Sequence, residues 1–99
     1  MPYKLSRKAE DDIIQIYVSG AQEFGIAQAD RYHAGLEEVF AFLDEYPRAA
    51  RERTEINPPV RIQPYKSHMV VYVIADDGGP FILRIRHGPE DWSGAPLGS

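Results

Sequence analysis

The chain has 99 residues, contains no cysteine and carries a formal net charge of −4. This length suits one domain with a single modest core, and the lack of cysteine excludes disulfides, thiolate metal sites and a cysteine nucleophile. Residues 1–47 carry four basic and nine acidic side chains, whereas residues 48–99 carry seven basic and six acidic ones. This charge distribution attracts nucleic acid only weakly, so we expect no sequence-specific DNA binding. We expect instead an acidic protein partner beside the second half of the chain.

The first residues, Met1-Pro2-Tyr3-Lys4-Leu5, lack the apolar core of a signal peptide. No apolar run approaches the length that a membrane-spanning helix needs. We therefore expect a soluble, cytoplasmic protein without a membrane partner.

A short strand at residues 2–5 precedes two predicted helices, at residues 7–24 and 27–46. Ser6 is a plausible N-cap, and apolar residues then recur at helical spacing until Gly25, which is typical of a helix C-terminus. A second apolar stripe runs to Pro47. Helices joined through a single glycine region form an antiparallel hairpin.

The second half predicts an antiparallel meander. Three β-branched runs are expected as strands at residues 60–64, 68–75 and 81–87, with Asp77-Gly78 as a strong hairpin signal. Residues 48–59 are expected to form an irregular connection, stiffened by a proline pair. The sequence thus predicts an α+β fold of order β-α-α-β-β-β, as a single domain over residues 1–92 with a flexible tail at 93–99.

Strict alternation along the last strand divides its side chains between two faces. One face receives Phe81, Leu83, Ile85 and His87, and the other receives Ile82, Arg84 and Arg86. Arginines on an apolar strand need solvent or an anionic partner, because an unpaired buried charge is costly. We expect the functional surface on the arginine face.

The chain offers few patterns that indicate catalysis. The three histidines lack metal-ligand spacing, and no Gly-x-Ser-x-Gly elbow is present, so we expect neither a metal nor a catalytic serine. Cleavage of RNA through its own 2′-hydroxyl remains open, with Arg61, Arg84 and Arg86 as cations and His87 or Tyr65 as proton-transfer groups. Alternation places His87 away from the two strand arginines, and only a bulge would bring them together, so catalysis is disfavoured.

Ordered sets of residues along most of the chain carry a family resemblance. The opening set is Tyr3-Lys4-Leu5-Ser6 with Ala9-Glu10-Asp11-Asp12-Ile13, and the closing set is Pro64-Tyr65, Ser67-His68, Ile82-Leu83-Arg84-Ile85, His87-Gly88 and Asp91-Trp92. In order and spacing these sets resemble the ParE-type toxins of bacterial toxin–antitoxin systems. The resemblance covers nearly everything from residue 3 to 92. In one departure, Val73 follows Tyr72 where many such toxins carry an arginine.

The resemblance implies the RelE/ParE-like fold, in which a helical hairpin packs on a small, mostly antiparallel sheet. It also implies a toxin that poisons DNA gyrase and forms a hetero-oligomer with a ParD-type antitoxin, without a cofactor. RelE-like relatives are ribosome-dependent ribonucleases on the same fold, which keeps an enzymatic alternative open. We expect an amphipathic antitoxin segment in the groove between hairpin and sheet, its carboxylates meeting arginines. The expected antitoxin-binding or target-binding residues are Arg61, Tyr65, Arg84, Arg86, His87 and Trp92. Trp92 is equally well explained as a cap over the core.

Overall fold

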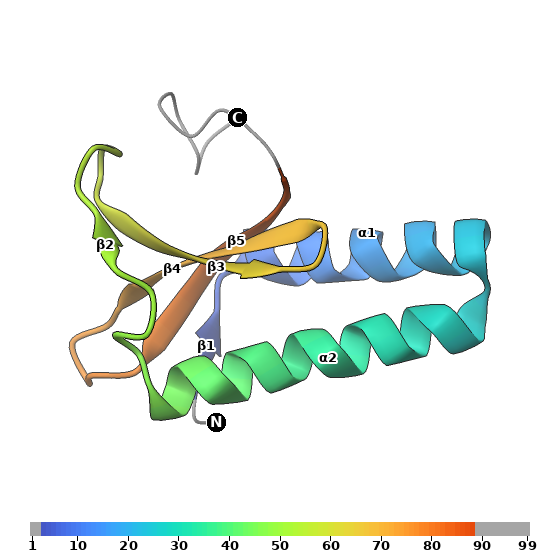
Figure 1. The fold of residues 1–99 in the computed structure, drawn as a ribbon, viewed down its shortest axis with the longest axis horizontal. Coiled ribbons are helices and arrows are strands. Elements are labelled where there is room, and N and C mark those ends of the chain that lie inside the picture. Colours follow the sequence, from blue (N-terminus) through green and yellow to red (C-terminus); the bar gives the residue numbers. More distant parts are fainter. Residues whose placement is uncertain (1–2, 89–99) are drawn as a thin grey trace.

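Two helices pack against a five-stranded mixed sheet in the computed structural model, which describes residues 3–88 (Figure 1). The elements are β1 (Lys4–Leu5), α1 (Arg7–Phe24), α2 (Ile26–Glu45), β2 (Glu52–Arg53), β3 (Val60–Tyr65), β4 (His68–Ile74) and β5 (Pro80–His87). The strand order is β1-β5-β4-β3-β2, with β1 parallel to β5 and every other pairing antiparallel. The predicted α+β class is confirmed.

The two helices begin and end close to their predicted bounds. The Ser6 hydroxyl caps α1 by accepting a hydrogen bond from the Ala9 N–H at 2.9 Å, and it donates to the Leu83 carbonyl of β5 at 2.7 Å. Gly25 separates the helices with a φ of +92°, a conformation that glycine adopts without steric cost. The cap of α1 is therefore also a tie between the helix and the sheet.

The sheet has one strand more than the sequence predicts. The three strands of the meander lie where they are expected, whereas residue 2 of the predicted first strand lies outside the described residues. The prediction of an irregular connection throughout residues 48–59 was wrong, because Glu52–Arg53 pairs with β3. A two-residue polar strand at the edge of a sheet carries no apolar period that sequence reasoning can detect.

Two tight turns order the meander. At the predicted hairpin between β4 and β5, Gly78 has a φ of +88° and the Gly79 N–H donates to the Asp77 carboxylate at 2.9 Å. Between β3 and β4 only Lys66 and Ser67 intervene, and Lys66 has a φ of +51°. His68 directly follows the second turn and is the first residue of β4.

A β-bulge interrupts the alternation of β5. Tyr72 pairs with Ile82 but Val71 pairs with Arg84, so Leu83 is an extra residue on β5. Consequently Ile82 and Ile85 both join the core beneath the helices, while Leu83 packs with the apolar cluster built around Ile56, Val60 and Val71. The prediction that Ile82 and Ile85 occupy opposite faces, with Leu83 beside Ile85, was wrong for this reason.

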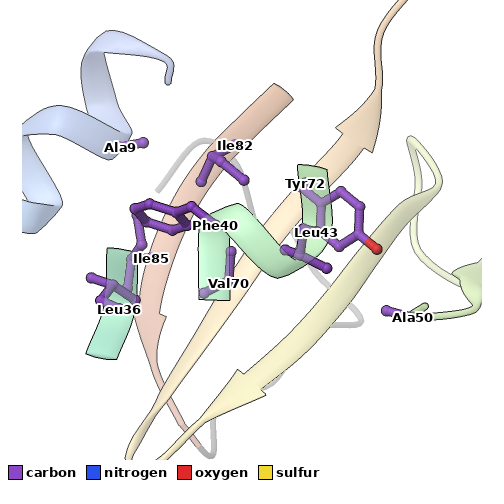
Figure 2. Packing of buried hydrophobic residues seen from close by; sticks show 9 residues of the cluster. All are labelled: Ala9, Leu36, Phe40, Leu43, Ala50, Val70, Tyr72, Ile82 and Ile85. Atoms are coloured by element: carbon purple, nitrogen blue, oxygen red, sulfur yellow. The ribbon is translucent and has the colours of Figure 1, made fainter. Parts of the chain in front are cut away.

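The main core lies where α2 crosses the sheet. Figure 2 shows Phe40 at its centre, next to Ile82 and Ile85, with Leu43 close to Tyr72. The residues of this cluster are Ala9, Leu36, Phe40, Leu43, Ala50, Val70, Tyr72, Ile82 and Ile85. The Tyr72 hydroxyl donates a hydrogen bond to the Pro47 carbonyl at 2.7 Å, and burial raises the pKa of Tyr72. The end of α2 is thereby fixed to β4.

The helical hairpin is longer than the sheet is wide, so its tip extends beyond the strands (Figure 1). Phe24 and Ile26 lie at this tip and are 60% and 65% exposed. Neither helix in the described part of the chain is long and apolar enough to cross a membrane.

Candidate functional site

A groove of about 570 Å³ lies between the helical hairpin and the ends of β4 and β5. Sequence analysis expects a partner-binding groove in this part of the fold. Both helices and the strand ends contribute lining residues, which are Ile13, Gln15, Ile16, Tyr17, Ser19, Gly20, Glu23, Phe24, Gln28, Ala29, Tyr32, His33, Leu36, Ser67, His68 and His87. We call this site the hairpin groove.

The walls of the hairpin groove are largely apolar. Ile13, Ile16 and Phe24 come from α1, and Leu36 comes from α2. The helices approach closely at Gly20 and Ala29, where a methyl group added to the glycine would lie 3.8 Å from the alanine Cβ. A concave apolar surface with a few polar groups is the ordinary form of a binding site for an apolar partner.

Four polar side chains form one end of the groove, and we call them the histidine floor. The Tyr32 hydroxyl shares a hydrogen bond with His68 Nδ1 at 2.6 Å and lies 3.3 Å from the Ser67 hydroxyl. The rings of His68 and His87 pack edge to face, with centroids 5.1 Å apart. The ladder pairs these two histidines directly across β4 and β5, which is why residues 19 apart in sequence meet.

A second polar group lies along the wall that the two helices share. The Tyr17 hydroxyl donates to the Asp30 carboxylate at 2.5 Å, and this hydrogen bond raises the pKa of the tyrosine. On the same helix as Asp30, His33 Nε2 lies 3.5 Å from a Glu37 carboxylate oxygen. The Tyr17–Asp30 hydrogen bond joins α1 to α2, and the ring of Tyr17 packs edge to face against His33.

Arg84 is held within the protein by Asp12 of α1, which sequence analysis did not identify as its partner. Its Nε and Nη2 donate to the two Asp12 oxygens at 2.8 and 3.1 Å, and the Ile85 N–H also donates to Asp12. Both charged side chains are mostly buried. The bulge precedes both strand arginines, so Arg84 and Arg86, paired with Val71 and Met69, stay on one face of β5, but the Arg84 guanidinium is engaged by α1.

Arg61 and Tyr65 also have structural partners. The Arg61 guanidinium donates to the Ala50 carbonyl at 2.6 Å, which supports the loop after α2. The Tyr65 hydroxyl donates to the Tyr32 carbonyl at 2.9 Å. Whether these residues also contact a partner stays a prediction.

Of the five expected binding residues that the structure describes, one lines the hairpin groove. That residue is His87, whereas Arg61, Tyr65, Arg84 and Arg86 lie outside its lining and Trp92 lies outside the described residues. Sequence reasoning missed Tyr32 and His68 as site residues. The pairing of β4 and β5 across the Asp77-Gly78 turn was a signal that could have placed His68 near His87.

No group of three or more metal-ligating side chains is found among residues 3–88. The described groove lining combines apolar walls with three imidazoles, four hydroxyl groups, two amides and the Glu23 carboxylate. These groups suit the docking of an amphipathic partner.

Comparison with known proteins defines the class of the fold first. A solved structure titled "Chromosomal ParDE TA system from P. aeruginosa" superposes with a TM-score of 0.75 at 22% identity, covering 88% of this chain and 95% of that chain. The fold is thus one found in a toxin–antitoxin assembly.

Sequence comparison then gives the family. The Toxin ParE1 of Caulobacter vibrioides is 30% identical over 71 residues, which are 72% of this chain and 74% of that protein. A family model described as "ParE toxin of type II toxin-antitoxin system, parDE" matches residues 3–92. The chain belongs to the ParE toxin family of type II toxin–antitoxin systems.

Proposed function

We propose that this chain inhibits bacterial growth by poisoning DNA gyrase, and that a ParD-type antitoxin neutralises it in a hetero-oligomer. Both partners would be met in the cytoplasm. An amphipathic segment of the antitoxin would occupy the hairpin groove, with its apolar side chains between α1 and α2. This mode of recognition places one apolar helix face in a preformed groove.

The observation that carries the proposal is the hairpin groove itself, in a chain that belongs to the ParE family. The same helices that bury Leu36 and Phe40 against the sheet leave Phe24 and Ile26 exposed at their tip. An apolar surface of this kind, with polar groups at one end, is typical of a protein–protein interface.

Two contacts favour a binding mechanism over catalysis. Cleavage of RNA develops negative charge on phosphorus, and guanidinium groups must be available to stabilise it. The guanidinium of Arg84 is engaged by Asp12, and that of Arg61 is engaged by the Ala50 carbonyl. These two arginines serve the fold in the structure described here.

One feature favours the ribonuclease alternative. His68 and His87 are neighbours, and Tyr32 is hydrogen-bonded to His68, so a pair of proton-transfer groups does exist. Lys66 adds a cation at the adjacent turn, 6.0 Å from the centroid of the Tyr32 ring. The alternative therefore has to be decided by experiment.

The experiment expresses the chain in bacteria with and without its antitoxin, and follows replication and messenger RNA in parallel. Filamentation, induction of the DNA-damage response and loss of supercoiling by purified gyrase support the proposal. Rescue by the co-expressed antitoxin supports its neutralising role. Prompt cleavage of translated messages, with supercoiling unchanged, would establish the ribonuclease reading instead.

A further inference from the structure

We propose that His87 docks a carboxylate side chain of the antitoxin at the end of the hairpin groove. The inference rests on the proposed function, since it names the chemistry of the partner in the same groove. It assigns the anionic contact to the histidine floor rather than to the arginines of β3 and β5.

The geometry of the histidine floor presents His87 toward a partner. His87 ends β5, is solvent-exposed and lines the groove. Its neighbour His68 is held by Tyr32 and lies 3.4 Å from the Ser67 hydroxyl. The Gly88 N–H also donates to the Ser67 carbonyl at 2.9 Å, so the backbone beside His87 is tied to the preceding turn. His87 is thus an exposed side chain on a fixed support.

The chemistry of the surrounding groups favours an acceptor with negative charge. The floor offers imidazole and hydroxyl groups, which can all donate hydrogen bonds, and Lys66 adds a positive charge at the turn. A carboxylate is an acceptor only, so it is the side chain that complements such a set. Two neighbouring imidazoles also repel each other when both are protonated, and an anion beside them removes that penalty.

The other titratable groups facing the floor are few. From α1 they are Tyr17 and Glu23, and from α2 they are Tyr32 and His33, the latter beside Glu37. Among the groove-lining residues that the structure describes, Glu23 is the one carboxylate, and it lies on α1 near the hairpin tip. Within residues 3–88, the floor therefore has no anionic side chain of this chain's own.

A carboxylate contact at this position makes antitoxin binding depend on pH. An imidazole that gains an anionic partner holds its proton more tightly in the complex than in the free protein. Binding is therefore strongest below the ordinary titration range of histidine. It weakens as the pH rises through the pKa that the imidazole has in the complex. An imidazole pKa that is about one unit higher in the complex than in the free protein predicts about fivefold tighter binding at pH 6 than at pH 8.

The test is calorimetric titration of the full chain with the antitoxin encoded beside its gene, at pH 6 and pH 8. The wild-type ratio of dissociation constants should be about five, and His87→Gln should bring it close to one, because glutamine keeps a donor but cannot become charged. His33→Gln is the matched control, since His33 already has Glu37 beside it. The control should keep the wild-type ratio, whatever its effect on affinity itself. Thermal unfolding of each variant verifies that it is folded.

The partner's side of the contact is tested by changing each antitoxin Asp or Glu to its amide, one at a time. One such change should also remove the pH dependence, and combining it with His87→Gln should add no further loss. A wild-type ratio of one, or a ratio that survives His87→Gln, overturns the inference and leaves the proposed function standing. Failure of the antitoxin to bind at either pH overturns both.

Discussion

The two helices behave differently along their length. Over the sheet, Ala9, Leu36, Phe40 and Leu43 are at most 1% exposed and close the main core. Beyond the sheet, Phe24 and Ile26 on the same helices remain more than half exposed. We call these regions the covered part and the overhanging part of the hairpin.

The difference shows how one amphipathic hairpin can serve two purposes. Burying apolar area in the covered part stabilises the fold, since each large side chain contributes about 1.5–3 kcal/mol when fully buried. The overhanging part contributes little to folding, because its apolar groups stay in contact with water. Its apolar surface is thus available for binding a partner, and changes in the two parts should affect different measurements.

The largest effect is expected in the covered part. Phe40→Ala removes the central ring of the core and should lower the free energy of unfolding by about 3–5 kcal/mol, measured by urea denaturation. Phe42→Ala is the matched control on the same helix, where the ring is 45% exposed. The control should cost less than about 1 kcal/mol. Equal losses for the two variants would show that the core is not where the structure places it.

A somewhat smaller loss is expected where the covered part of α1 meets β5. Asp12→Asn keeps the shape of the side chain but leaves Arg84 mostly buried without its anionic partner. The free energy of unfolding should fall by about 2–3 kcal/mol, as for a hydrogen-bonded charge in a partly buried site. The exposed ion pair of Lys4 with Asp77 supplies the contrast. Lys4→Met should leave the urea midpoint unchanged, because exposed pairs contribute little. If Asp12→Asn were equally harmless, the Arg84 contact would not stabilise the fold.

The overhanging part should respond in binding rather than in stability. Phe24→Ala removes an exposed ring that lines the hairpin groove, so the unfolding midpoint should not change. Affinity for the antitoxin should fall about tenfold, as expected for an aromatic contact in an interface. Ile14→Ala is the control, since Ile14 is 57% exposed on α1 but lies outside the groove lining. Loss of affinity with Ile14→Ala alone would place the antitoxin on the outer face of α1.

The smallest effect concerns the contact of α2 with β3. A methyl group at Gly35 would overlap the Tyr65 hydroxyl. Gly35→Ala should therefore destabilise the protein by about 1 kcal/mol, since it displaces the tyrosine from the Tyr32 carbonyl. In a Tyr65→Ala background the same change should stabilise by about 0.5–1 kcal/mol, because alanine favours the helix. Chemical denaturation of the wild type, the two single variants and the double variant measures whether the effect of Gly35→Ala on the free energy of unfolding changes sign. The same sign in both backgrounds would contradict the overlap.

The sequence predicts the helices and the meander because each has a clear apolar period. Ser6 and Gly25 bound α1 as expected, and Asp77-Gly78 forms the turn that its residues predict. The bulge in β5 was not predictable in this way. The run from Ile82 to Ile85 presents apolar side chains to both faces, so a shift by one residue does not disturb the local pattern.

The candidate site was less predictable than the fold, because its contacts join distant residues. The Arg84–Asp12 pair spans 72 residues, and the Tyr32–His68 hydrogen bond spans 36. Sequence analysis identified His87 as a candidate, but it examined only whether His87 could act together with the arginines of the same strand. Its actual neighbour is set by the register between β4 and β5, which depends on the Asp77-Gly78 turn and on the bulge at Leu83.

The parallel pairing of β1 with β5 has a consequence for synthesis on the ribosome. Lys4 lies opposite Phe81, so the earliest strand has its sheet partner only after nearly all of the described chain has been made. At 5–20 residues per second, roughly 4–14 s separate the translation of Asp12 from that of Arg84. During that interval α1 has neither its strand nor its charge partner. A nascent chain that stalls before β5 would therefore lack both the finished sheet and the histidine pair, so the hairpin groove is expected to be complete only when β5 has been made.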